Sequence, residues 1–255
     1  MLNIVIPMAG RGSRFADEGY TLPKPLIPVH GIEMIRLVIG NLRPSQAHRF
    51  IFLCLQEHIE KYQVDQKLAE WAPGCIVVPV KAVTEGAACT VLLAREYIDN
   101  DDPMMIGNSD QWVDVSIDDY LAAMGDADGL IMTMWADHPK WSYVRLDDGE
   151  SIIEVVEKEV VSNEATVGIY NFRHGREFVA AADAMIARNF RVNGEFYVAP
   201  AYNEMIAEGK TLLFHNIGKE YEGMYGIGIP TDLKKFEGFP VSQKAVAQAK
   251  NEGDV

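Results

Sequence analysis

The stretch of residues 3–27 constrains the fold of this chain more than any other. It opens with a short apolar run over residues 3–7, whose β-branched side chains are typical of a buried strand in a parallel sheet. The run leads into a turn made of Ala9, Gly10, Arg11 and Gly12. Small residues let the backbone turn tightly and come close to a ligand. Successive free N–H groups in such a turn form a cradle for phosphate oxygens.

Positive side chains accompany this turn. Arg11 lies within it, Arg14 follows directly, and Lys24 comes 12 residues after Gly12. A plain strand-to-helix turn would explain the glycines, but it would not explain Arg14 and Lys24. The combination therefore predicts a site for a polyphosphate.

These residues resemble the N-terminal signature of the sugar-phosphate nucleotidyltransferases, also called nucleoside-diphosphate-sugar pyrophosphorylases. That signature is an apolar strand, then G-x-G-x-R, then P-K-P; Gly10, Gly12, Arg14 and Pro23-Lys24-Pro25 match it. A P-loop would need G-x-x-x-x-G-K-[ST], which the chain lacks. A dinucleotide-binding fingerprint would need a third glycine where Phe15 stands. The resemblance runs on, less sharply, to about Leu233.

The order of expected elements predicts an α/β fold. Apolar strands at 49–55, 75–80 and 103–107 alternate with helical patterns at 33–42, 56–71 and 86–98. This alternation predicts a doubly wound, mostly parallel sheet that binds ligands at the carboxyl ends of its strands. The resemblance implies that this sheet is the Rossmann-like nucleotidyltransferase fold with an acceptor-binding lobe.

In the second half the expected strands and helices no longer alternate regularly. We expect a hairpin over 143–157, a strand over 166–172, helices over 177–189 and 197–208, strands over 211–216 and 225–229, and a helix from Thr231, which would cap it. We expect one domain over residues 1–240, with a nucleotide-binding half (1–128) and an acceptor-binding half (129–240). Residues 241–255 would form a C-terminal tail or short helix.

Net charge and the lengths of the apolar runs argue against nucleic acid and membrane as partners. A net charge of −14 disfavours nucleic acid, which normally needs a basic face. No apolar run reaches the roughly 18 residues of a membrane span. The chain has three widely spaced cysteines, Cys54, Cys75 and Cys89. An odd number at such spacing indicates free thiols in a reducing compartment. Met1 leads straight into the first strand without a signal peptide, so we expect a cytoplasmic protein.

Asn108-Ser109-Asp110 ends the expected strand at 103–107, the usual place for a functional carboxylate in an open α/β sheet. A hard cation such as Mg²⁺ prefers oxygen ligands and bridges phosphate oxygens. The resemblance implies that Asp110 is the metal-ligating aspartate, with Mg²⁺ as cofactor. The alternative is that Asp110 caps the following turn.

Glu85 and Gly86 lie between a strand and a helix, where the resemblance implies a loop that contacts the nucleotide base. The alternative is that Glu85 is an ordinary first-turn acid of the helix. In the second half, Lys158 stands in an E-K-P-like stretch in which Glu159 replaces the proline. The resemblance implies that Lys158 holds the acceptor phosphate, that Gly168 lies near the acceptor, and that Glu195 accepts bonds from acceptor hydroxyls.

One motif departs from the family pattern W-x-D-x-G-T-P, whose aspartate is a second metal ligand. Here Gly226 occupies the aspartate position, with Gly228 and Pro230 setting the register. Another acid (Glu222 or Glu195) or a water would then complete the metal shell.

The resemblance implies a nucleotidyltransferase that moves NMP from an NTP to a phosphorylated acceptor, by default a sugar 1-phosphate, and releases pyrophosphate. Arg14, Lys24 and Asp110 would be its catalytic residues. One alternative is a nucleotide-sugar-dependent glycosyltransferase, although Asn108 replaces the first acid of its usual D-x-D. The other is a nucleotide-binding regulatory relative without turnover, which Gly226 motivates.

Overall fold

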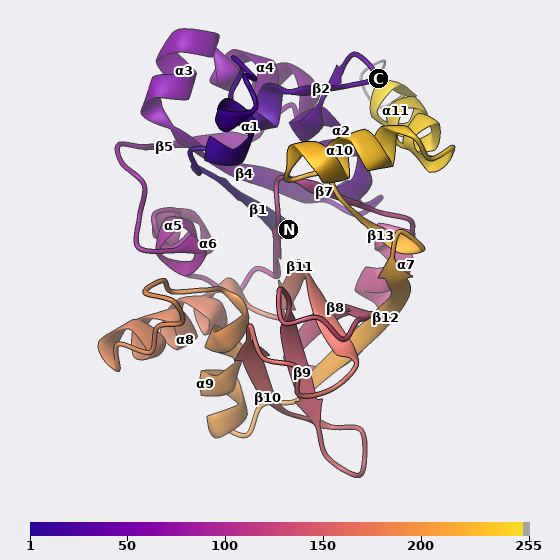
Figure 1. Cartoon of the computed structure of the whole chain (residues 1–255). Helices are drawn as coiled ribbons and strands as arrows, with labels where there is room; N and C mark the ends of the chain where they lie inside the picture. The colour runs from indigo at the N-terminus through magenta and orange to yellow at the C-terminus, as the bar shows by residue number, and fades with distance from the viewer. Residues whose placement is uncertain (252–255) are drawn as a thin grey trace.

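One large mixed sheet crosses the computed structural model of the chain, which describes residues 1–251 (Figure 1). Its strand order is β5-β4-β1-β6-β11-β8-β12-β13-β7. The first-half strands are β1 (Leu2–Met8), β4 (His48–Leu55), β5 (Ile76–Val80) and β6 (Met104–Gly107). They pair in parallel. The predicted α/β class is therefore confirmed, and β11 (Glu164–Phe172) joins the second half by running antiparallel to β6.

Helices cover this parallel region. They are α1 (Ser13–Asp17), α2 (Met34–Leu42), α3 (Gln56–Tyr62), α4 (Val64–Trp71), α5 (Ala87–Leu92) and α6 (Arg95–Ile98), with a short 3-10 turn η1 (Lys24–Leu26) and a two-stranded ribbon of β2 (Pro28–Val29) and β3 (Ile32–Glu33). The single helix expected over 56–71 was wrong. It divides at Gln63, whose left-handed φ of 53° ends α3 and begins α4. The helix expected over 86–98 likewise divides into α5 and α6.

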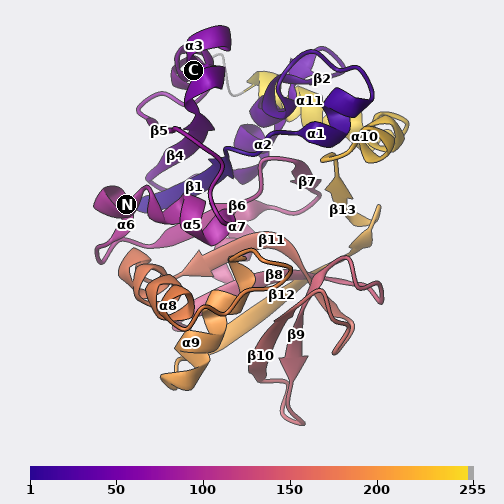
Figure 2. The ribbon, with the colours of Figure 1, turned by 60° about the vertical axis from the view of Figure 1, so that its left-hand side comes forward.

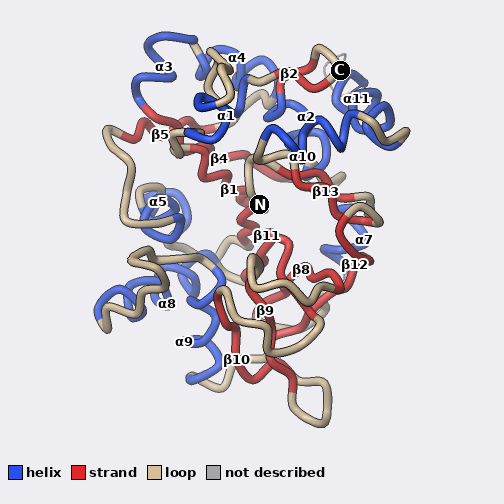
Figure 3. The backbone as a smooth tube through the Cα atoms, viewed as in Figure 1, coloured by secondary structure: helices blue, strands red, loops and turns tan. Residues whose placement is uncertain are grey.

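The second half adds further strands, shown in red in Figure 3, most of which pair antiparallel, whereas β12 pairs in parallel with β8 and β13. Its elements are β7 (Gln111–Val113), α7 (Ile117–Ala122), β8 (Gly129–Trp135), β9 (Ser142–Leu146), β10 (Ile152–Glu157), α8 (Gly175–Ala187), η2 (Ala199–Ala201), α9 (Tyr202–Ala207), β12 (Leu212–Glu220) and β13 (Gly223–Gly226). The predicted hairpin is present as the antiparallel pair of β9 and β10. The second of the two expected helices is shorter than predicted, because α9 starts only at Tyr202.

The end of the described chain returns to the first half. Helix α11 (Val241–Asn251) lies beside α2, and α10 (Pro230–Glu237) connects β13 to it (Figures 1 and 2). Phe236 and Ala245 are buried in one apolar cluster with Leu37 of α2. Residues 241–251 thus form a packed helix. The predicted Thr231 cap was wrong: α10 begins after Ile229, and no side chain caps it.

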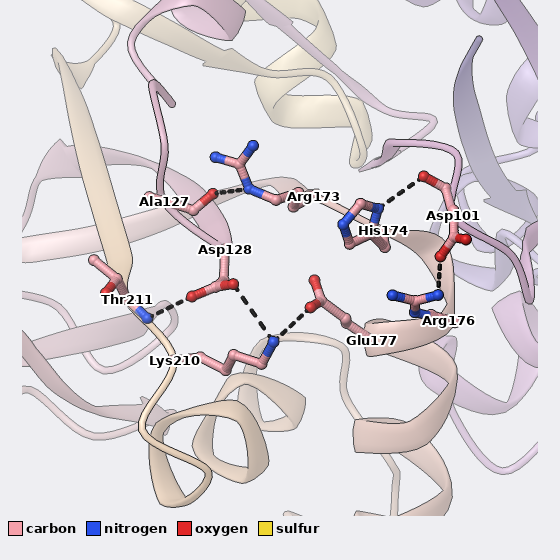
Figure 4. A network of polar contacts seen from close by, with 9 residues as sticks. All are labelled: Asp101, Ala127, Asp128, Arg173, His174, Arg176, Glu177, Lys210 and Thr211. Atoms are coloured by element: carbon pink, nitrogen blue, oxygen red, sulfur yellow. Dashed lines mark hydrogen bonds and ion pairs between the residues drawn. The ribbon is translucent and has the colours of Figure 1, made fainter.

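A dense polar network lies at the edge of the sheet where β6, β8 and β12 begin (Figure 4). At its centre the Lys210 ammonium donates to Glu177 at 2.7 Å and lies 3.5 Å from an oxygen of Asp128. The Arg173 guanidinium donates to the Ala127 carbonyl at 2.8 Å, and Thr211 N–H donates to Asp128 at 2.8 Å. This network joins the segments that lead into β8 and β12 to the segment that follows β11. It lies at the opposite end of the strands from the glycine turn.

Candidate active site

The glycine turn after β1 lies against η1. Gly12 has a left-handed φ of 63° and caps α1, with its carbonyl accepting from Phe15 N–H at 3.0 Å. A Cβ at Gly12 would stand 3.1 Å from Lys24 Cβ, so the turn and the lysine are in close contact. Gly10 faces open space, with no heavy atom within 4 Å of where its Cβ would be. The turn therefore leaves room for a ligand directly beside Lys24.

Lys24 and Asp110 meet across this turn. The Lys24 ammonium donates to Asp110 Oδ2 at 2.7 Å, although the two residues are 86 positions apart. Their side chains are 20% and 28% exposed, so the pair is screened from water but still reachable. Asp110 extends from the segment after β6, and its carbonyl accepts from Ile227 N–H at 2.9 Å. Two predicted catalytic residues thus lie together at the carboxyl edge of the parallel strands.

A cavity of about 260 Å³ opens on this turn. Its lining includes five of the predicted site residues: Ala9, Gly10, Lys24, Gly86 and Glu195. Thr84, Thr90 and Ser109 add polar groups to the wall. Glu195, which the sequence assigned to the acceptor, therefore lies in the same cavity as the glycine turn.

Two predicted nucleotide-binding side chains, Arg11 and Glu85, and two predicted catalytic ones, Arg14 and Asp110, do not line this cavity. Arg11 and Arg14 are exposed on and after the turn, and neither has a hydrogen bond or ion pair within residues 1–251. Glu85 is 69% exposed and pairs with Arg191, whose guanidinium donates to it at 3.1 Å. The two arginines are thus uncommitted cations, whereas Glu85 already has a partner.

A second cavity of about 290 Å³ adjoins the first, because Pro7 and Ala87 line both. It contains the predicted acceptor residues Lys158 and Gly168. The remaining wall consists of Ile106, Asn108, Lys140, Trp141, Ser142, Glu157, Thr166, Val167, Tyr170, Tyr197, Val198 and Ala199. Two neighbouring cavities with a shared wall suit two substrates that must react with each other.

Lys158 is held at the rim of the second cavity. It adopts a left-handed φ of 62°, and its ammonium donates to the Lys140 carbonyl at 2.9 Å. It also lies 3.3 Å from Glu157, whose side chain is only 3% exposed and accepts a hydrogen bond from the Ser142 hydroxyl. Sequence reasoning missed Glu157 as a site residue. Its position before the E-K-P-like lysine was the available signal.

Burial favours the neutral form of the Tyr170 phenol in this cavity. Desolvation raises the pKa of Tyr170 above its ordinary value, and the nearby negative charge of Glu157 raises it further. The Tyr170 hydroxyl therefore stays neutral at physiological pH, within 2.9 Å of the Thr166 hydroxyl. A neutral phenol next to a buried carboxylate gives this wall both donors and acceptors.

Two glycines make room for polar side chains at the sheet edge. Gly168 has a left-handed φ of 84°, and a Cβ there would collide with the Asn108 amide. Gly228 lies against Asp110: a Cβ at Gly228 would stand 2.9 Å from Asp110 Cγ and closer still to Oδ2. Gly226, at the position of the missing aspartate, is less crowded. Its nearest neighbour would be Asp232 Oδ2 at 3.8 Å.

The residues present fit a cation that is held in part by substrate. Within residues 1–251 no group of three His, Cys, Asp or Glu side chains forms a metal site. Asp110 offers one carboxylate, with Lys24 on only one of its oxygens. Magnesium is commonly bound by one or two carboxylates together with substrate phosphates. Asp110 beside the glycine turn is therefore a suitable donor, although position 226 offers no second acid.

A parallel sheet with a glycine turn, a lysine and an acid at its carboxyl edge defines a nucleotide-binding α/β protein. The chain belongs to the nucleotidyl transferase family, whose model matches residues 4–189. Family members generally use a divalent metal. Within residues 1–251, none of the helices is both long and apolar enough to cross a bilayer.

Similar proteins support this assignment. The bifunctional protein GlmU of Methanococcus maripaludis is 26% identical over 239 residues, which cover 91% of this chain and 53% of the relative. The GlmU of Methanococcus aeolicus is 25% identical with the same coverage. The chain thus spans about half the length of the curated relatives it matches.

Solved structures give the same result. The nucleoside-diphosphate-sugar pyrophosphorylase from Vibrio cholerae RC9 superposes with a TM-score of 0.79 at 26% identity, covering 92% of this chain and 99% of that one. The inositol-1-phosphate CTP transferase from T. maritima superposes with a TM-score of 0.73, covering 97% and 96%. At 14% identity the latter similarity shows the fold alone.

Proposed function

We propose that this protein transfers a nucleoside monophosphate from an NTP to a phosphorylated small-molecule acceptor, a sugar 1-phosphate by default, with release of pyrophosphate. The observation that carries the proposal is the Lys24–Asp110 pair, at 2.7 Å beside the glycine turn, with Lys24 lining the first of two adjoining cavities. A charge-stabilising pair beside two cavities that share a wall suits a transfer between two bound substrates. Family membership and the similarity to a nucleoside-diphosphate-sugar pyrophosphorylase support it.

Chemistry of this kind needs little from the protein beyond position and charge. The acceptor phosphate oxygen attacks the α-phosphorus in line with the leaving pyrophosphate. A phosphomonoester has a second pKa of roughly 6, so it is largely ionised near neutral pH and needs no strong general base. Lys24 then neutralises charge that develops on the α-phosphate. The turn amides from Gly10 to Gly12, with Arg11 and Arg14, hold the triphosphate.

We assign Mg²⁺ to Asp110, where the ion would neutralise phosphate charge. On the acceptor side, Lys158 holds the acceptor phosphate as a point charge. Gly168 keeps the wall of the acceptor cavity open, and Glu195 accepts hydrogen bonds from acceptor hydroxyls. Gly86 allows the base to approach the backbone, with Glu85 next to it. We also propose a cytoplasmic location, because Cys54, Cys75 and Cys89 are free thiols, which suit a reducing compartment.

The deciding experiment pairs each NTP with a panel of phosphorylated acceptors in the presence of Mg²⁺. The panel contains hexose 1-phosphates, inositol phosphates and phosphorylated amino alcohols. We expect pyrophosphate release that depends on both substrates. Release of free nucleoside diphosphate from nucleotide sugars would instead indicate a glycosyltransferase. Tight NTP binding by calorimetry without pyrophosphate from any acceptor would indicate a regulatory relative, the outcome that Gly226 motivates.

A further inference from the structure

The two cavities are separated by a contact between segments far apart in sequence. Phe196 N–H donates to the Glu85 carbonyl at 2.8 Å, and Ala88 N–H donates to the Phe196 carbonyl at 3.1 Å. Between these bonds only a glycine fits. Gly86 has a φ of 137°, and a Cβ there would stand 2.6 Å from Phe196 N. We call this contact of Glu85, Gly86 and Ala88 with Phe196 the loop joint.

Arg191 fastens the loop joint from outside. Its guanidinium donates to Glu85 at 3.1 Å and stacks 4.0 Å from the centroid of the Phe196 ring. It also donates to the Gly194 carbonyl at 3.1 Å and to Asn189 at 2.7 Å. Arginine is suited to this role because its planar group can stack on a ring and donate several hydrogen bonds at once. Phe196 itself is 1% exposed, so its ring is a fixed platform.

The segment that Arg191 fastens begins with a hairpin turn and carries residues of both cavities. Val192 and Glu195 exchange two backbone hydrogen bonds of 3.0 Å around Asn193 and Gly194, whose φ values are 49° and 82°. Two positive φ angles are typical of a tight two-residue hairpin turn. Glu195 then lines the first cavity, while Tyr197, Val198 and Ala199 line the second. Movement of this segment would therefore alter both walls together.

We propose that Arg191 is a positioning residue that couples the two substrate sites through the loop joint. The coupling rests on the function proposed above. A nucleotide that orders residues 84–88 also orders residues 195–199, and the acceptor then binds a wall already in place. Because coupling between sites is reciprocal, the acceptor favours the nucleotide by the same factor. An exposed ion pair alone contributes little, so the expected loss is modest and falls on coupling rather than on chemistry.

The test compares Arg191→Met with Arg188→Met. Arg188 is a matched control, since it pairs with Glu204 and lines neither of the two cavities. Calorimetry with Mg²⁺ measures the affinity for glucose 1-phosphate with and without the α,β-methylene analogue of each NTP. We expect the analogue to tighten glucose 1-phosphate binding in wild type. Arg191→Met should reduce that tightening roughly three- to fivefold, while leaving the affinity for the analogue alone nearly unchanged.

Further readouts separate positioning from general damage. Arg191→Met should raise the acceptor KM with little change in kcat, and Arg191→Lys should recover part of the loss because it retains the charge. Hydrogen exchange of the Ala88 and Phe196 amides, without any substrate, should be faster in Arg191→Met than in wild type or Arg188→Met.

Unchanged exchange in Arg191→Met, or full coupling in that variant, would overturn the role of Arg191 while leaving the proposed function intact. Failure of wild type to bind any analogue would overturn the proposed function and the coupling with it. In that case the exchange measurement alone would still report whether Arg191 fastens the loop joint.

Discussion

The two edges of the large sheet use charge differently. Where β6, β8 and β12 begin, Lys210 bridges Asp128 and Glu177 (Figure 4). The N-terminal ammonium lies 2.9 Å from Asp102. Where β1 and β6 end, Arg11 and Arg14 are exposed and form no ion pair within residues 1–251. The first edge satisfies its charges internally, whereas the second leaves cations for something else to satisfy.

This difference separates stability from function. Paired charges at the first edge hold chain crossings together, and they offer nothing to a ligand. The exposed cations at the second edge contribute no ion pair to the fold within residues 1–251, and under the proposed function a bound polyanion would neutralise them. Proteins commonly trade stability for activity at such sites. Substitutions at the first edge should therefore lower stability more than turnover, and substitutions at the second edge should lower turnover more than stability.

The largest effect is expected at the Lys24–Asp110 pair. Lys24→Ala and Asp110→Ala should each lower turnover by roughly two orders of magnitude or more, because each removes a charge-stabilising group. Pyrophosphate release at saturating substrates measures the loss. Lys219→Ala, which removes a half-exposed surface lysine paired with Glu222, should keep normal turnover. Near-normal turnover in either active-site variant would contradict these roles.

At the opposite edge the effect should fall on stability. Lys210→Met leaves Glu177, whose side chain is 12% exposed, without its ionic partner. We expect a loss of about 2 kcal/mol in the free energy of unfolding, which corresponds to a few degrees in melting temperature. Thermal unfolding measures it, with Lys219→Met as the exposed control. If Lys210→Met lost turnover while its melting temperature stayed unchanged, the two edges would not differ in the way proposed.

A methyl group can probe the packing behind Asp110. Gly228→Ala puts a Cβ against the Asp110 carboxylate and should displace it from Lys24, lowering turnover roughly tenfold. Gly226→Ala is the matched control, because its Cβ would meet nothing nearer than 3.8 Å. Equal activities in the two variants would mean that the position of Asp110 does not matter.

The missing acid can be supplied by substitution. Gly226 has room for a side chain and lies outside the left-handed region, so Gly226→Asp should fold normally. If the metal is held by Asp110, a second carboxylate should lower the Mg²⁺ concentration for half-maximal turnover several-fold. Gly226→Asn controls for size without charge. A raised Mg²⁺ requirement would show that the added charge instead repels Asp232.

The smallest effect is a pH dependence at the paired edge. The hydrogen bond to Glu177 raises the pKa of Lys210 above its ordinary value of 10.5. A raised lysine pKa stabilises the fold below 10.5, and this stabilisation is lost as the pH rises through the folded-state pKa. The melting-temperature gap between wild type and Lys210→Met should therefore narrow above pH 10.5. A constant gap would mean that the lysine charge contributes nothing.

Local features of this fold were predictable because short-range physics determines them. The glycine turn, the parallel strands and the hairpin follow from residue type and spacing. The meeting of Lys24 with Asp110 was also predictable in outline, since the carboxyl ends of neighbouring parallel strands share one edge. The break at Gln63 was not, because a non-glycine residue with positive φ leaves no pattern in the surrounding sequence.

Contacts between residues far apart in the sequence could not be predicted. Arg191 reaches Glu85 across 106 positions, and no spacing rule links them. The crowding of Gly228 against Asp110 is equally invisible, because a glycine that fits by space alone resembles any turn glycine. Glu195 shows a different limit. Its motif was matched, but whether it faces the first or the second cavity depends on the hairpin turn before it and on the loop joint after it.

The return of α11 to helix α2 has a practical consequence for handling this molecule. A tether attached after α11 would hold the protein by its first half and leave the β9–β10 hairpin pointing away from the support (Figures 1 and 2). Shortening the chain before Val241 would instead strip the cover from Leu37 and Trp112, two side chains buried beneath it. Attachment after α11 should therefore be tolerated, whereas deletion of α11 should destabilise the protein.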